Sequence, residues 1–178
     1  MLSPSHSANI VAVTKLNESQ LRLATSNWLK QRYDSFKFHL PIMIFHNLGM
    51  SLKDFLLKKF DGDDLACIPN YFTLNIRPDI IGILVLPNSE RRHRAWIIAE
   101  CKSKKAIGYS DFRQFADYAQ KTNAYGAYFV YNDNLSSEIE DQMRSAGTYD
   151  GMNRWGQITR KRLIITNYEN GRFRRRYF

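Results

Sequence analysis

The sequence predicts an α/β domain in which a mixed central sheet is flanked by helices. Apolar, β-rich runs alternate with amphipathic helical segments through the second half of the chain, a pattern typical of a sheet covered by helices. The length of 178 residues is usual for one domain. Hydrophobic residues make up 44% of the chain, which is ample for a core. We therefore expect a single domain over residues 1–178.

The first half of the chain is expected to supply two helices and one strand. The helices are predicted over 17–33 and 51–60, and the strand over 36–45. Asn17 and Ser51 are typical helix N-caps and precede the helical patterns. Pro41 indicates an edge or a bend in the strand, because proline cannot donate a ladder hydrogen bond. Residues 1–9 are small and polar and are predicted to form a flexible arm.

The second half is expected to supply strands and helices in alternation. The strands are predicted over 71–86, 95–102, 124–132 and 160–169, and the helices over 111–123 and 135–147. The first two of these strands are expected to pair across the basic turn between them. Gly147 is expected to end the second helix. A basic tail, about 171–178, follows the last predicted strand and is the strongest local charge cluster.

Charge and cysteine usage narrow the class of protein. Twenty-six Lys and Arg against 17 Asp and Glu give a net charge of +9, which favours a polyanionic partner, nucleic acid first and an acidic membrane surface second. Cys67 and Cys101 are too few for a disulfide framework, and no spacing indicates a zinc site. The chain starts without a signal-peptide pattern and has no apolar run of membrane-span length. A cytoplasmic protein without a membrane partner is expected.

Two charged positions interrupt the apolar strands. Asp79 follows Pro78, where the strand is expected to bend or begin. Glu100 and Lys102 are two residues apart, so both should project from one face of a strand while Cys101 projects from the other. On neighbouring strands, Asp79 and Glu100 could converge on one hard cation, Mg²⁺, with Mn²⁺ as a substitute. A metal and a nearby ammonium are what hydrolysis of a phosphodiester requires.

This spacing resembles the PD-(D/E)XK signature of the restriction-endonuclease-like nuclease superfamily. Pro78 and Asp79 match its first part, and Glu100, Cys101 and Lys102 match its second. The resemblance implies a restriction-endonuclease-like core of a helix, a three-stranded antiparallel meander, a helix and a further strand. It also implies a Mg²⁺-dependent endonuclease, for which DNA is the expected substrate and RNA the alternative. In this family the Asp and Glu bind the metal and the Lys assists the attacking water.

Three further residues match positions that members of the superfamily often share. Gln114 and Tyr118, four residues apart on the helix after the Lys-bearing strand, are implied to belong to the site. Glu18 on the first helix is the matching candidate for a third metal ligand. The helix over 51–60 is an insertion relative to the implied core.

Two arginine-rich segments are candidates for binding the phosphate backbone. The turn carries Arg91, Arg92 and Arg94, which are predicted to grip phosphates flanking the cleaved one. The tail carries Arg172, Arg174, Arg175 and Arg176, interleaved with Phe173 and Tyr177. A solvated hairpin tip and a solubilising terminus are the plainer interpretations. Cleavage of both strands by one-site subunits would call for a homodimer or two sequential nicks.

Plainer interpretations also exist for the site. Glu100 and Lys102 could mark a strand that reaches solvent, and Asp79 could be a turn residue. Glu18 could be a first-turn acid that favours the helix dipole, and Gln114 with Tyr118 could be an ordinary surface pair. The rival function is a non-catalytic nucleic-acid-binding module that retains the nuclease fold. A more remote one is an interaction protein with an acidic partner. The intact acidic and lysine positions favour the nuclease.

Overall fold

The computed structural model describes residues 15–34, 42–46, 49–62, 75–86, 93–103 and 107–176. The helices are α1 (Glu18–Asp34), α2 (Leu52–Lys59), α4 (Tyr109–Thr122) and α5 (Ser137–Ala146). The strands are β1 (Ile42–His46), β2 (Ile80–Leu86), β3 (His93–Lys102), β4 (Gly126–Tyr131), β5 (Thr148–Met152), β6 (Ile158–Arg162), β7 (Ile164–Glu169) and β8 (Arg172–Arg176).

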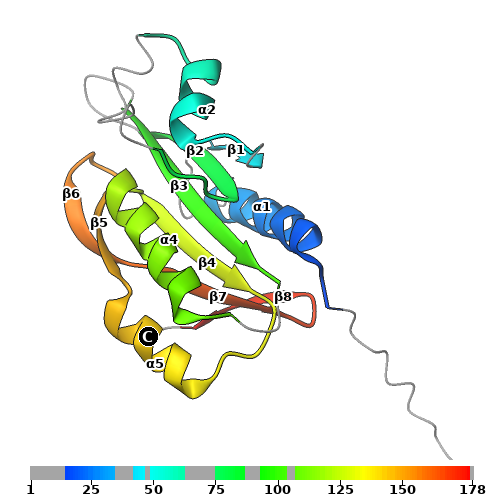
Figure 1. The fold of residues 1–178 in the computed structure, drawn as a ribbon. Coiled ribbons are helices and arrows are strands. Elements are labelled where there is room, and N and C mark those ends of the chain that lie inside the picture. The colour runs from blue at the N-terminus through cyan, green and yellow to red at the C-terminus, as the bar shows by residue number, and fades with distance from the viewer. Residues whose placement is uncertain are drawn as a thin grey trace, which may run out of the picture.

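Six strands form one mixed sheet in the order β1-β2-β3-β4-β7-β8. Strands β1, β2 and β3 are antiparallel neighbours, β4 and β7 run parallel to β3, and β8 is antiparallel to β7. Strands β5 and β6 form a separate antiparallel pair. Helix α1 covers one face of the sheet and α4 and α5 cover the other (Figure 1). The predicted α/β class with a mixed central sheet flanked by helices is confirmed.

Local capping explains where the helices begin. Asn17 and Gln20 exchange side chain to backbone hydrogen bonds of 2.9 and 3.0 Å at the start of α1. Ser51 accepts a hydrogen bond from the amide of Asp54 at the start of α2. Helix α5 ends at Gly147, as its sequence predicts. Both predicted N-caps are therefore confirmed.

Strand β2 begins directly after Asp79 and is buried along almost its whole length. It pairs with β3 in the predicted antiparallel hairpin, with Ile80 opposite Ala99. This register places Asp79 beside Glu100 at the end of the pair. The bend expected at Pro78 falls just before the ladder, which starts at Ile80, and Pro78 itself has no amide hydrogen to donate to it.

The predicted last strand over 160–169 is two strands. The chain leaves β6 and enters β7 at Leu163, whose amide donates to the Gly147 carbonyl at 2.7 Å. Strand β6 pairs with β5, which the sequence analysis did not predict. The uninterrupted run of strand-forming residues concealed the change of partner, because periodicity carries no information about which strand lies alongside.

The predicted basic tail is largely a sheet strand. Asn170 and Gly171 have φ of 52° and 75° and join β7 to β8 as a two-residue hairpin turn. Phe173 stacks on Trp28 of α1 with ring centroids 4.7 Å apart. The Asn-Gly pair is a strong hairpin signal that the arginines around it obscured. Strand β8 is therefore an edge of the sheet and contributes to packing.

Some predicted features lie outside the described residues. These are the arm over 1–9, the first part of the predicted strand over 36–45, Arg91, Arg92 and Tyr177. Within the described ranges, no helix has both the length and the apolar character needed to cross a membrane.

Candidate functional site

The predicted site lies where β2 begins and β3 ends. One carboxylate oxygen of Asp79 (Oδ2) accepts a hydrogen bond from the Cys101 amide at 2.8 Å, which ties Asp79 to the end of β3. The Cys101 side chain is buried in the core beneath α1, with its thiol 3.6 Å from the Thr25 hydroxyl. Glu100 and Lys102 project from the opposite face, so the predicted alternation is confirmed.

Glu100 and Lys102 form a close ion pair. The Lys102 ammonium nitrogen (Nζ) lies 2.7 Å from Glu100 Oε1, and the side chains are only 12% and 18% exposed. The other carboxylate oxygen, Oε2, is buried and has no hydrogen-bond partner in the described structure. A buried carboxylate oxygen without a donor is costly, so this oxygen is available to a cation or to water.

Helix α1 contributes an arginine that the sequence analysis did not predict. Arg22 Nη2 lies 2.9 Å from Asp79 Oδ1 and also forms an ion pair with Glu18 one turn earlier. The spacing of four residues between Glu18 and Arg22 is a helix-surface pair visible in the sequence. Nothing local indicates that Arg22 reaches Asp79, which is far along the chain. We call Glu18, Arg22, Asp79, Glu100 and Lys102 the carboxylate cluster.

Burial sets the electrostatics of the carboxylate cluster. It raises the pKa of Asp79, against the opposing effects of the Cys101 amide and Arg22. Burial also raises the pKa of Glu100, and the neighbouring Asp79 carboxylate raises it further. A buried carboxylate whose ionisation is further disfavoured by a second one nearby marks a place where a divalent cation would be stabilised.

The pKa of Lys102 is set by its acidic neighbours more than by its burial. Burial lowers the pKa of Lys102, but the hydrogen bond and charge of Glu100, with Asp79 and Asp111, outweigh burial and leave this pKa raised. The side chain is therefore an ammonium at neutral pH. A permanently charged Lys102 suits stabilisation of negative charge better than removal of a proton.

The start of α4 also faces the carboxylate cluster. Asp111 accepts a hydrogen bond from the Gly108 amide at 3.0 Å, which caps the helix, and its charge acts on Lys102. Gln114 and Tyr118 lie further along the same helix, where Gln114 Nε2 donates to the Tyr118 hydroxyl at 3.1 Å. The structure therefore brings the side chains of Gln114 and Tyr118 into contact with each other. Asp111 is a nearby acid that the sequence analysis did not select.

Arg94 is far from the carboxylate cluster. It lies near the start of β3 and Glu100 near its end, about 20 Å apart at the rise of an extended strand. The guanidinium carbon of Arg94 lies 5.1 Å from the centroid of the Phe60 ring. The predicted contact of Arg94 with a phosphate flanking the cleaved one therefore stays a prediction, and Arg94 would have to make it at this distance from Glu100.

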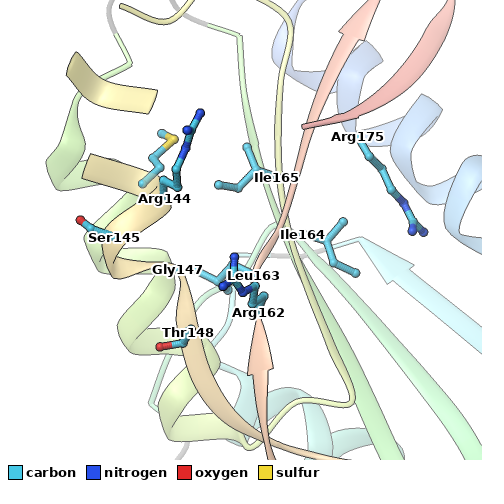
Figure 2. Close-up of a pocket in the computed structure, with 10 residues that line it drawn as sticks. Arg144, Ser145, Gly147, Thr148, Arg162, Leu163, Ile164, Ile165 and Arg175 are labelled. Carbon is cyan, nitrogen blue, oxygen red and sulfur yellow. The ribbon is translucent and has the colours of Figure 1, made fainter. Parts of the chain in front are cut away.

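The β8 arginines are divided between the two faces of the sheet. Lys102, Tyr131, Asn167 and Arg174 are successive register partners across β3, β4, β7 and β8. Arg174 therefore shares a face with Lys102, about 14 Å away over three strand spacings. Its side chain is 60% exposed and lies 3.5 Å from Glu169. Arg175 extends from the other side of β7 (Figure 2).

A cavity of about 290 Å³ lies elsewhere in the molecule, beside the start of β7. Figure 2 shows Arg144 and Arg162 on one side of β7 with Leu163 and Ile165. No residue of the carboxylate cluster lines this cavity. The carboxylate cluster and this cavity are thus separate features.

Asp79 and Glu100 are the residues that could hold a metal ion. In the part of the chain that the structure describes, no group of three His, Cys, Asp or Glu side chains could hold one. Magnesium commonly keeps several waters and takes only one or two protein carboxylates, so two acids suffice. The unpaired Glu100 Oε2 fits such a role. Glu18 reaches this centre through Arg22, as an indirect partner of Asp79.

Comparison of the chain with protein-family models, with curated proteins and with solved structures finds no match. The functional argument therefore depends on the geometry of the carboxylate cluster and on the distribution of charge around it.

Proposed function

We propose that the chain is a metal-dependent endonuclease that hydrolyses DNA phosphodiester bonds on a restriction-endonuclease-like core. One observation carries the proposal. Asp79 and Glu100 meet at neighbouring strand ends with the Lys102 ammonium beside them, and Glu100 keeps one buried oxygen without a donor. Apart from α2, which is inserted between β1 and β2, the order α1, β1, β2, β3, α4, β4 supports it, because this is the order that the sequence resemblance implies.

Each side chain has a distinct part in the proposed reaction. A magnesium ion bound by Asp79 and Glu100 would lower the pKa of a bound water and stabilise charge on the phosphate. The Cys101 amide orients Asp79, and Lys102 orients Glu100 while it presents a positive charge to the developing phosphate anion. Gln114 and Tyr118 lie one to two turns beyond Asp111 and are proposed to contact the substrate.

Arg22 is proposed as a positioning residue. Its guanidinium holds Asp79 from the side of α1 and compensates part of the negative charge when no metal is bound. Glu18 holds Arg22 in turn. Arg22 and the Cys101 amide oppose the rise in the pKa of Asp79 that burial causes, and so favour the ionised state that a hard cation requires.

A second function, a non-catalytic nucleic-acid-binding module, is favoured by one specific observation. Both Asp79 oxygens already have protein partners, the Cys101 amide and Arg22, and Lys102 neutralises Glu100. A self-contained ion network could stabilise the sheet end without a metal. The two functions differ in whether Mg²⁺ binds at the carboxylate cluster.

Incubation with supercoiled plasmid DNA tests the proposal. The intact chain should nick or linearise the plasmid with Mg²⁺ or Mn²⁺ and leave it supercoiled in EDTA. Glu100→Gln should abolish cleavage and Mg²⁺ binding measured by calorimetry, because a neutral amide is a poorer ligand for a hard cation. Glu138→Gln, at an exposed acid of α5, is the matched control and should retain both. A plasmid that stays supercoiled with Mg²⁺ as well as in EDTA, together with no detectable Mg²⁺ binding, would favour the non-catalytic module.

A further inference from the structure

The β5–β6 pair forms a ribbon that stands apart from the main sheet. Strand β5 packs against α4, and β6 lies outside it with four of its five residues exposed. Figure 1 shows this ribbon, in orange, along the side of the molecule beside α4. We call Thr148–Arg162 the β5–β6 ribbon. Nothing in the proposed reaction uses it.

Strand alternation directs the side chains of β6. Lys161 points inward, where its ammonium donates to the backbone carbonyls of Tyr125 and Met152. Ile158, Arg160 and Arg162 must therefore point outward. The Arg160 side chain is 65% exposed, forms an ion pair with Asp150 at 3.3 Å and donates a hydrogen bond to the Thr148 hydroxyl at 2.8 Å. Such a surface pair is weak, so Arg160 can exchange Asp150 for a stronger anionic partner.

The turn of the ribbon presents an aromatic ring on a rigid support. The Asn153 side chain accepts hydrogen bonds from the amides of Trp155 and Gln157, both at 2.9 Å, and Gly156 has the φ of 78° that the turn requires. Trp155 is 60% exposed. The guanidinium carbon of Arg154 lies 4.4 Å from the centroid of its ring. The turn therefore displays a cation and an aromatic ring together.

Charge and exposed apolar area identify the kind of partner. The ribbon contains four basic residues and one acid, Asp150. Arg162 extends this charge to the end of the ribbon, where it lines the same cavity as Arg144 of α5 (Figure 2). Ile158, next to the turn, is 62% exposed. Phosphates would satisfy the cations, but exposed Trp155 and Ile158 are better matched to base faces, which duplex DNA conceals and a single strand presents.

We infer that the β5–β6 ribbon binds single-stranded nucleic acid, with Arg154 and Arg160 on phosphates and Trp155 stacked on an unpaired base. The inference rests on the proposed function only for the choice of nucleic acid as partner. Met152 donates to the carbonyl of Asn123 at the end of α4, whereas Asp111 at its start faces the carboxylate cluster. The length of α4 therefore separates the two surfaces by about 20 Å. A substrate with a single-stranded segment at that distance from the cleaved bond would contact both.

Fluorescence anisotropy of a labelled single-stranded oligonucleotide, titrated with the full chain in EDTA, tests the ribbon without cleavage. Trp155→Ala should weaken binding about 5-fold to 100-fold, the loss expected for one stacked base. Trp155→Phe keeps a ring and should lose less. The double variant Arg154→Gln with Arg160→Gln should lower the slope of log affinity against log salt by about 1.4, since each lost phosphate contact removes about 0.7. Leu23→Ala and Lys121→Gln, exposed positions on α1 and α4, are matched controls.

Three outcomes would overturn the inference. Wild-type affinity and salt slope in all ribbon variants would show that the ribbon is not a contact surface. An equal loss of affinity for heparin, which has charge but no bases, in Trp155→Ala would rule out stacking. Loss of affinity for a duplex alone would exclude the single strand. Each of these measurements is independent of plasmid cleavage. If the ribbon variants bind normally and the plasmid is cleaved, only the ribbon inference is overturned. If the ribbon variants lose affinity and the plasmid is not cleaved, only the proposed nuclease function is overturned.

Discussion

The carboxylate cluster and the β5–β6 ribbon both carry several charged side chains, but they hold them in opposite ways. In the carboxylate cluster, Asp79, Glu100 and Lys102 are largely buried, and Asp79 pairs with Arg22 while Glu100 pairs with Lys102. In the ribbon, Arg154 and Arg160 are exposed, and Trp155 beside them is exposed as well. Burial makes each charge of the carboxylate cluster depend strongly on its neighbours, whereas the exposed ion pair of Arg160 with Asp150 is screened by solvent.

This difference indicates which charged residues should affect cleavage or folding and which should affect binding. Buried charges have shifted pKa values and strong mutual interactions, so the loss of one changes the chemistry of the rest. Exposed charges are screened by salt, and each contributes a small and additive part of the affinity for a polyanion. Substitutions in the carboxylate cluster should therefore have large effects on cleavage or folding, and substitutions on the exposed surfaces should have graded effects on binding.

The largest effect is expected at Lys102. Lys102→Met should reduce single-turnover cleavage of DNA at least about 100-fold, because the lost ammonium stabilises charge that develops in the transition state. Binding of uncleaved DNA in EDTA should change little. Lys121→Met, at an exposed lysine of α4, is the control and should cleave normally. Cleavage at the wild-type rate by folded Lys102→Met would remove this lysine from the reaction and erase the contrast between the two regions.

A smaller but clear effect on stability is expected at Arg22. Arg22→Gln leaves buried Asp79 without its cation and should lower the free energy of unfolding by about 1–2 kcal/mol in EDTA, a value reduced for the partial exposure of Arg22. Magnesium should restore part of this loss. Urea denaturation with and without Mg²⁺ measures both, with Arg113→Gln on the exposed face of α4 as the control. A loss that Mg²⁺ does not reduce would indicate a structural ion network.

The metal-free protein should show the pH dependence of its buried acids. The folded-state pKa values of Asp79 and Glu100 are raised above their ordinary values of 3.8 and 4.5, so the folded chain binds protons that the unfolded chain does not. Their contribution to stability should therefore increase as the pH falls from neutral through the raised values, and stop increasing near the ordinary ones.

The difference in unfolding free energy between wild type and the double variant Asp79→Asn with Glu100→Gln isolates this contribution. In EDTA the difference should move in favour of wild type as the pH falls from 7 toward about 4. Arg154→Gln in the ribbon should give a constant difference from wild type over the same range. A difference that is flat with pH for the double variant would mean that these carboxylates are not disfavoured by burial.

The smallest effect is expected at Arg174, which is exposed but shares a sheet face with Lys102. Arg174→Gln should lower the slope of log affinity for duplex DNA against log salt by about 0.9 and leave cleavage of saturated DNA nearly unchanged. Lys30→Gln, at an exposed residue of α1, is the control for a general loss of charge. Anisotropy titrations over a range of salt give the slopes. Equal slopes for Arg174→Gln and wild type would show that Arg174 does not contact the DNA backbone.

Much of the fold could be predicted because its signals are local. Helical spacing and the caps Asn17 and Ser51 depend on residues within one turn, and strand alternation placed Glu100 and Lys102 on one face. Strand β8 also carried a local signal, the Asn170-Gly171 turn, which its arginines concealed. The split between β6 and β7 had no such signal, because a strand does not record its partner in its own periodicity.

By itself, the sequence determined the α/β class, the positions of the helices and the grouping of Asp79, Glu100 and Lys102 as candidate site residues. Only the tertiary structure decided that Arg22 reaches Asp79, that Arg94 lies at the far end of β3 and that β5 and β6 leave the main sheet. The physical reason is range. Capping and alternation are set by neighbours in the chain, whereas the pairing of distant charges and the separation of two surfaces depend on strand register, strand length and the path of α4, which no local pattern encodes.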